Sequence, residues 1–103
     1  MKGYVVCVYK NITNEEKLKE YAVKASIAVE KYKGKFLIRG GKATANEGES
    51  SPRTVVIEFP SYDEANLFYK SKEYQEKLLE GMKIELEKNT EIVENQYLTK
   101  YQE

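Results

Sequence analysis

Histidine and tryptophan are absent from this 103-residue sequence, and cysteine occurs once. Without histidine the chain lacks the commonest general base and the usual haem-ligating side chain, which excludes haem chemistry and histidine-dependent mechanisms. The single cysteine, Cys7, offers no internal disulfide and no Cys–His nucleophile pair, and its apolar neighbours predict a buried, inert thiol. No nucleotide-binding loop or metal-ligand spacing is present, so we expect no cofactor and no metal.

A net charge of either sign is also lacking, because 17 Lys and Arg balance 17 Asp and Glu. No overall field therefore draws the chain to nucleic acid or to an anionic membrane, and we expect neither partner. The apolar runs are only a few residues long, which excludes a transmembrane span, and the N-terminus leads straight into a strand. We expect one cytoplasmic domain over residues 1–99, followed by a frayed tail at 100–103.

The strongest element that is present is the stretch 53–60. Its alternation places Val55, Ile57 and Phe59 on one face of a strand, and burial of each contributes roughly 1.5 to 3 kcal/mol. The other face is mixed, because it carries the charged side chain of Glu58. We therefore expect this strand to organise the domain.

The remaining patterns predict a β-α-β-β-α-β order with a broken second helical region. The predicted elements begin with a strand at 4–9, a helix from a Thr13 capping box to a left-handed Gly34, and a strand at 36–39 that runs into Gly40-Gly41, where we expect a bulge, a bend or a close backbone contact. A long polar hairpin at 42–52 and the strand at 53–59 follow. The second helical region is a helix capped by Ser61 and another capped by Ser71, whose apolar stripe reaches Leu86 and is weakened at Gly81, and the last strand lies at 91–94 and reaches towards Tyr97 and Leu98.

This order predicts an α+β fold with the ferredoxin-like arrangement, an antiparallel sheet with its helices on one face. The first three strands carry apolar residues on both faces, however, and the chain has no second layer to cover the other face. Because large apolar patches are rare on monomers, we expect a homodimer packed sheet against sheet.

The sequence closely resembles the DUF1330 family along nearly its whole length. The resemblance is carried by the order and spacing of Phe36-Leu37-Ile38-Arg39-Gly40-Gly41, Glu47-Gly48, Pro52-Arg53, Val55-Val56-Ile57-Glu58-Phe59-Pro60-Ser61, Ala65, Tyr69, Ser71, Glu73-Tyr74-Gln75 and Ile92-Val93. It implies a dimeric α+β barrel, in a superfamily that also holds cofactor-free monooxygenases, muconolactone isomerases and haem-binding chlorite dismutases. It implies none of those activities for this chain.

Two residues are candidates for acid–base chemistry. Glu58, on the mixed face of a central strand, could act as a base if burial raised its pKa. The alternative for Glu58 is a salt bridge or a hydrated position at the rim. Tyr69 could donate a phenolic hydrogen bond in a pocket, although its helical spacing favours ordinary core or interface packing.

Three residues are candidates for ligand binding. Arg39 and Arg53 are the only two arginines, and they flank the long hairpin, where their planar guanidinium groups would suit a small acid. Arg39 could instead pair with Glu58 or with Glu47. Tyr74 could line the same pocket or pack in the core.

Three functions fit these residues to different degrees. The first is a homodimer that binds a small, possibly acidic, molecule or acts as a cofactor-independent enzyme, with a pocket between sheet and helices. The second is a non-catalytic interaction module that only dimerises through its sheet. The third, RNA binding, fits poorly, because the strand at 53–59 offers no stacking aromatic residues on its mixed face.

Overall fold

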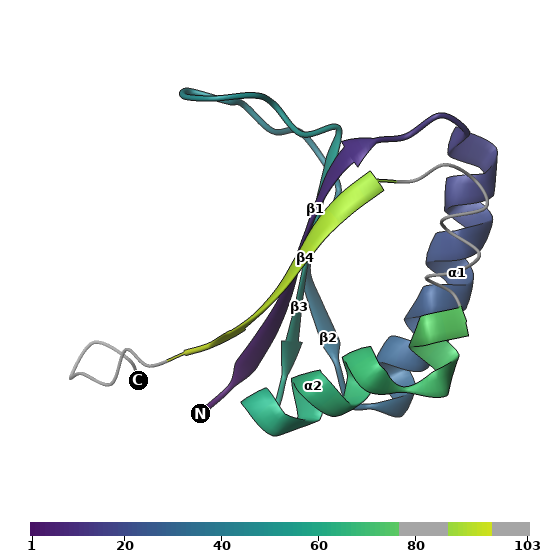
Figure 1. The fold of residues 1–103 in the computed structure, drawn as a ribbon, viewed down its shortest axis with the longest axis vertical. Coiled ribbons are helices and arrows are strands. Elements are labelled where there is room, and N and C mark those ends of the chain that lie inside the picture. The colour runs from purple at the N-terminus through teal and green to yellow at the C-terminus, as the bar shows by residue number, and fades with distance from the viewer. Residues whose placement is uncertain (77–86, 96–103) are drawn as a thin grey trace.

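The computed structural model describes residues 1–76 and 87–95, and it shows a twisted sheet with its helices on one side (Figure 1). The elements, in chain order, are β1 (Gly3–Asn11), α1 (Glu15–Lys31), β2 (Lys35–Arg39), β3 (Arg53–Phe59), α2 (Tyr62–Lys70) and β4 (Glu87–Glu94). Four predicted features lie outside the described residues. They are the apolar stripe from Leu78 to Leu86, the effect of Gly81, the extension to Tyr97 and Leu98, and the tail at 100–103.

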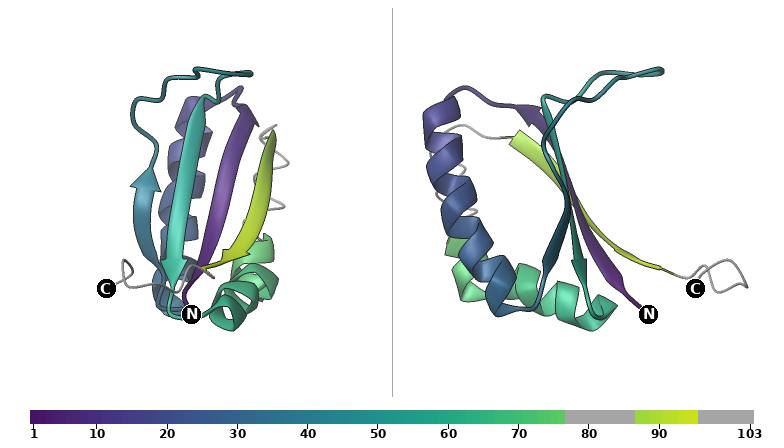
Figure 2. Two further views of the ribbon diagram at one scale, coloured as in Figure 1. Left: turned by 90° about the vertical axis from the view of Figure 1, so that its left-hand side faces the viewer. Right: turned by 180° about the vertical axis from the view of Figure 1, so that it is seen from behind.

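The four strands form one antiparallel sheet in the order β2-β3-β1-β4. The first and third strands of the chain are therefore the two central ones, as the right-handed crossovers require (Figure 2). This confirms the predicted α+β, ferredoxin-like order. β3 also has the predicted bounds, because its alternating pattern is strict.

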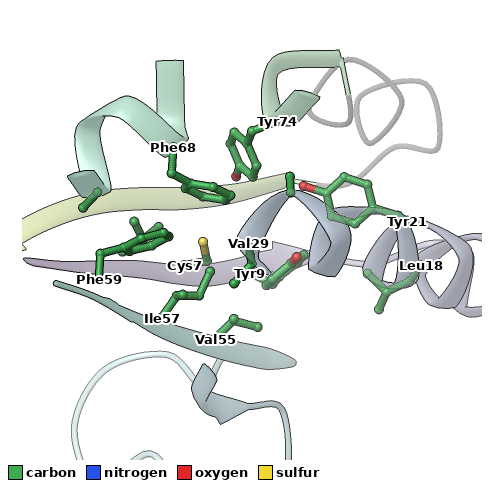
Figure 3. Close-up of a cluster of buried hydrophobic side chains, with 13 residues drawn as sticks. Cys7, Tyr9, Leu18, Tyr21, Val29, Val55, Ile57, Phe59, Phe68 and Tyr74 are labelled. Carbon is green, nitrogen blue, oxygen red and sulfur yellow. The ribbon is translucent and has the colours of Figure 1, made fainter. Parts of the chain in front are cut away.

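The core lies on the side of the sheet that faces the helices, which we call the inner face. Val5, Cys7 and Tyr9 of β1 alternate inwards and are at most 4% exposed. Helical residues cover them, and the rings of Phe59 on β3 and Phe68 on α2 are fully buried with centroids 4.9 Å apart (Figure 3). Cys7 is thus a buried free thiol, as expected.

The opposite side of the sheet, the outer face, is covered by none of the described elements, because both helices pack on the inner face (Figures 1 and 2). Its residues, read from the strand register, are Tyr4, Val6, Val8, Lys35, Ile38, Thr54, Val56, Glu58, Asn89, Glu91 and Val93. Val8, Ile38 and Val93 are 37%, 48% and 45% exposed. Apolar side chains on this face are therefore open to solvent on the single chain.

The ends of α1 differ by one residue from their predicted positions. The N-cap is Asn14 rather than Thr13, and its Oδ1 accepts a hydrogen bond of 3.0 Å from the Lys17 amide. Asparagine caps a helix at least as well as threonine, so the later start is favoured. At the other end Lys33, not Gly34, has the left-handed φ of 65°.

Gly34 is required for a different reason, which is close packing. A Cβ on Gly34 would lie 2.8 Å from the ring of Phe59 and 2.8 Å from Val29. Its amide donates to the Val29 carbonyl at 2.8 Å while the Lys33 amide donates to Glu30, which is the Schellman pattern of a helix C-terminus.

The second helical region begins at the two predicted caps. Ser61 accepts a 3.0 Å hydrogen bond from the Glu64 amide at the start of α2, and Ser71 accepts one of 3.1 Å from the Tyr74 amide at the start of helical residues 72–76.

Among residues 1–76 and 87–95, no helix is long and apolar enough to cross a membrane.

β4 begins at Glu87, four residues before the predicted start at Glu91. The polar run Lys88-Asn89-Thr90 breaks the apolar pattern on which the sequence prediction depended. These residues nevertheless pair with Tyr9, Val8 and Cys7 of β1. Tertiary pairing with a central strand has therefore overridden local composition.

The hairpin between β2 and β3 is long and polar, as predicted. Residues 41–50 are all exposed, and Gly40, Gly41 and Gly48 have positive φ. Figure 1 shows that the hairpin projects from the end of the sheet towards the side away from the helices.

Candidate functional site

A cavity of about 40 Å³ lies between the inner face of the sheet and α1. Ala22 and Ala25 face it from the helix, and their small side chains leave the space open. Its remaining apolar walls are Cys7, Val29, Phe36, Val55, Ile57 and Phe68. Its polar side chains are Tyr9, Tyr21, Arg39, Arg53, Tyr74 and Lys88.

The strand register explains why the polar groups meet at one end of the inner face. Tyr9 of β1 pairs with Arg53 of β3 on one side and with Lys88 of β4 on the other. In the next row of the same face, Val55 pairs with Arg39 of β2. The apolar side chains fill the rest of the face, so the register gathers three cations and Tyr9 at this end, where the hydroxyls of Tyr21 on α1 and of Tyr74 contact Lys88.

Lys88 lies within a group of three tyrosines, which we call the tyrosine cage. Its Nζ donates hydrogen bonds to the hydroxyl oxygens of Tyr21, at 2.9 Å, and Tyr74, at 2.8 Å. The same nitrogen lies 5.5, 5.3 and 5.2 Å from the ring centroids of Tyr9, Tyr21 and Tyr74. Cation–π attraction therefore offsets part of the cost of desolvating the ammonium group.

Arg53 places an unsatisfied donor at the cavity. Its Nε is buried and has no hydrogen-bond partner within residues 1–76 and 87–95, and its guanidinium carbon lies 6.0 Å from the ring centroid of Tyr9. A Cβ on Gly40 would lie 2.9 Å from Arg53 Nη1, so this glycine makes room for the guanidinium group. This is the close backbone contact that the Gly40-Gly41 pair led us to expect.

Arg39 is more exposed and better satisfied. Its Nη2 donates to the Ala22 carbonyl at 3.0 Å, and its guanidinium carbon lies 4.3 Å from the ring centroid of Phe36. Among the described residues it forms no ion pair with Glu58 or Glu47, so the alternative of a salt bridge for Arg39 is not realised there. Arg39 thus adds positive charge beside the cavity.

Within residues 1–76 and 87–95, no carboxylate lines the cavity to match these cations. Burial raises the pKa of Tyr9, and burial is also the largest cause that raises the pKa of Tyr74. Both phenols are consequently protonated at neutral pH and serve as hydrogen-bonding groups rather than as bases. The site suits an anion that brings its own negative charge.

Glu58 does not belong to this cavity. It lies on the outer face, where its carboxylate accepts hydrogen bonds from Lys2 Nζ at 3.0 Å and from the Tyr4 hydroxyl at 3.2 Å. The hydrogen bond from Lys2 lowers the pKa of Glu58, which is opposite to the rise that a buried base would need. The alternation of β3 separates Glu58 from its inner-face neighbours, and the structure matches the salt-bridge alternative.

Tyr69 and Tyr74 occupy different positions. Tyr74 is 3% exposed, lines the cavity and forms part of the tyrosine cage. Tyr69 packs beside it with ring centroids 5.5 Å apart, but it is not a lining residue. The structure therefore brings together Arg39, Arg53 and Tyr74 of the predicted site, and it leaves Glu58 and Tyr69 outside.

Sequence reasoning missed three of the polar lining residues. Tyr9 shares the inward alternation of Val5 and Cys7, and Tyr21 belongs to the apolar stripe of α1, so both signals were available. Lys88 gave no signal, because it precedes the predicted start of the last strand. Within the described ranges, no three metal-binding side chains lie close enough together to hold a metal ion.

Comparison with solved structures supports the fold. A protein of unknown function from Rhodopseudomonas palustris superposes with a TM-score of 0.70 at 13% identity, over 90% of this chain and 81% of that one. An EthD-family protein from Bacillus halodurans gives 0.61 at 14% identity, over 92% and 99% of the two chains. A protein from Thermobifida fusca, described as dimeric and ferredoxin-like and of unknown function, gives 0.56 at 9% identity over 91% of each chain.

Comparison with curated proteins and with family models gives a consistent result. No curated protein matches the sequence. The model of DUF1330, a domain of unknown function, matches residues 2–95. The chain therefore belongs to the DUF1330 family.

Proposed function

We propose that this protein is a homodimer that binds a small organic acid in the cavity between its sheet and α1. The observation that carries this proposal is the unbalanced charge of the cavity. Arg39, Arg53 and Lys88 contact a partly enclosed space that none of the carboxylates in the described ranges lines, and the buried Nε of Arg53 has no partner among the same residues. A buried donor without a partner costs free energy, which a bound carboxylate would recover.

The homodimer is supported by the outer face. Val8, Ile38 and Val93 leave apolar side chains in water on the single chain, and such patches usually mark interfaces. A second copy packed sheet against sheet would cover them with a self-complementary surface. The ferredoxin-like protein from Thermobifida fusca that shares this fold is described as dimeric.

The residues that line the cavity support binding more strongly than proton transfer. A cofactor-independent enzyme would need a base beside its ligand, and Glu58 lies on the other side of the sheet. Tyr9 and Tyr74 hold their protons because burial raises the pKa of each phenol. Binding of an acid uses these phenols in their protonated state, so no proton has to be transferred.

The test is a titration with small acids. We expect propionate to stabilise the protein against thermal unfolding and neutral propionamide, which has the same shape, to have no effect. At tenfold excess over the dissociation constant the gain is about 1.4 kcal/mol. For a domain of this size the midpoint should rise by roughly 5 to 10 °C.

Two substitutions of the same kind locate the site. Arg53→Met should remove the stabilisation by propionate, whereas Lys42→Met, which deletes a charge from the exposed hairpin, should leave it unchanged. Circular dichroism of both variants checks that the fold is retained. If propionate stabilised both variants equally, or if propionamide stabilised the wild type as well as propionate does, the proposed site would be refuted. Either result would favour an interaction module that only dimerises.

A further inference from the structure

Two of the three cations that line the cavity, Arg53 and Lys88, lie near the same aromatic ring, that of Tyr9. Arg53 and Lys88 are the two cross-strand neighbours of Tyr9, and all three side chains line the same cavity. The guanidinium carbon of Arg53 lies 6.0 Å from the Tyr9 ring centroid, and Lys88 Nζ lies 5.5 Å from it. Their strands are separated by the strand of Tyr9, so the backbone positions of the two cations are about 10 Å apart.

Each of these cations has a donor to offer. Among the described residues, the buried Nε–H of Arg53 has no partner. Lys88 donates two of the three N–H bonds of its ammonium group to Tyr21 and Tyr74, and the third has no partner in that same part of the chain. The tyrosine cage fixes where that nitrogen lies, so the second donor is positioned before any ligand arrives.

Arg39 differs from this pair. Its guanidinium group is already bonded to the Ala22 carbonyl and stacked on Phe36. It contributes to the positive potential of the cavity, but it does not offer a buried donor without a partner. The two cations that a ligand would satisfy most directly are therefore Arg53 and Lys88.

From this arrangement we infer that the acid bound by the cavity is a short dicarboxylate, with one carboxylate on Arg53, the other on Lys88 and its chain crossing Tyr9. The inference rests on the proposed acid-binding function and narrows it to a ligand class. The described residues give the ammonium of Lys88 no ion-pair partner, so a single carboxylate on Arg53 would leave that charge unmatched by them, whereas a dianion balances both cations. The small volume, about 40 Å³, restricts the ligand to a short chain.

The decisive comparison is between succinate and succinamate, which have the same length and shape but differ by one negative charge. Calorimetric titration of the wild-type protein at about pH 8, where both carboxyl groups of succinate are ionised, gives the two affinities. We expect succinate to bind roughly 10- to 100-fold more tightly, the factor for one additional charged hydrogen bond. Malonate, glutarate and inorganic phosphate complete the series.

Two variants assign the ends of the ligand. Lys88→Met removes the ammonium group and keeps an unbranched side chain one atom shorter. It should lower the affinity for succinate to that for succinamate, while the affinity for succinamate changes less than about threefold. Arg53→Met should weaken both ligands by at least tenfold. The comparison within the wild type does not depend on whether either variant folds.

The outcomes separate this inference from the proposed function. Equal affinity of the wild type for succinate and succinamate would overturn the dicarboxylate and leave acid binding intact. Tighter binding of phosphate than of every dicarboxylate tested would also overturn it, in favour of an inorganic oxyanion. Failure of every acid and anion in the series to bind would overturn both.

Discussion

Substitution of Val56 by glutamate tests whether the outer face is buried in a dimer. Val56 is central on that face, because it pairs with Val6 of β1 and with Ile38 of β2. On a single chain the new carboxylate would be hydrated, and its effect on stability should stay within about 1 kcal/mol. In a sheet-to-sheet dimer the twofold symmetry would place two such carboxylates in one interface.

The effect on association follows from that symmetry. A carboxylate removed from water without a partner costs several kcal/mol after relaxation, and each dimer would contain two. The substitution also removes the apolar burial of two valines, worth roughly 1.5 to 3 kcal/mol each when complete. A total of at least about 4 kcal/mol corresponds to an increase of roughly a thousandfold in the dissociation constant.

Sedimentation velocity at micromolar concentration measures this change directly. We expect the wild type to sediment as a dimer and Val56→Glu as a folded monomer. The matched control is Val23→Glu, because Val23 is 63% exposed on α1, on the opposite side of the sheet. A wild-type protein that sediments as a monomer, or a Val56→Glu protein that remains dimeric, would refute the sheet-to-sheet dimer. Dissociation of the Val23→Glu control would show that the loss of the dimer is not specific to the outer face.

Three further predictions concern local features of the fold. The hydrogen bond from Lys2 lowers the pKa of Glu58, so the stability that this contact contributes should be present above the ordinary pKa of 4.5 and lost as the pH falls through the lowered pKa. The thermal midpoints of Glu58→Gln and the wild type should therefore converge in acid. A difference in midpoint that stays constant with pH would contradict this prediction. Gly34→Ala should lower stability by about 1 to 3 kcal/mol because the added Cβ meets the ring of Phe59 at 2.8 Å, and an unchanged urea midpoint would show that the ring can move. Asn14→Ala should cost about 1 kcal/mol by loss of the cap and Asn14→Gly only a few tenths, whereas equal losses would mean that the cap is elsewhere.

The sequence predicted the fold because the patterns that determine it are local. The alternation from Val55 to Phe59 and the caps at Ser61 and Ser71 fixed the type and order of their elements without knowledge of distant contacts. The errors had two causes, one local and one tertiary. Asn14 replaced Thr13 as the cap because two adjacent residues can both serve, and β4 began early because pairing with β1 stabilises polar residues there.

What the sequence alone determined about this protein is its layer structure, because side-chain periodicity reports which face of each element is apolar. The arginines beside the hairpin were also visible, since Arg39 and Arg53 are the only two in the chain. Only the tertiary structure decided that Lys88 joins Tyr9 and Arg53 in one row. The register between strands that are far apart in the chain determines which residues share a row. A shift of one residue in that register would exchange the two faces.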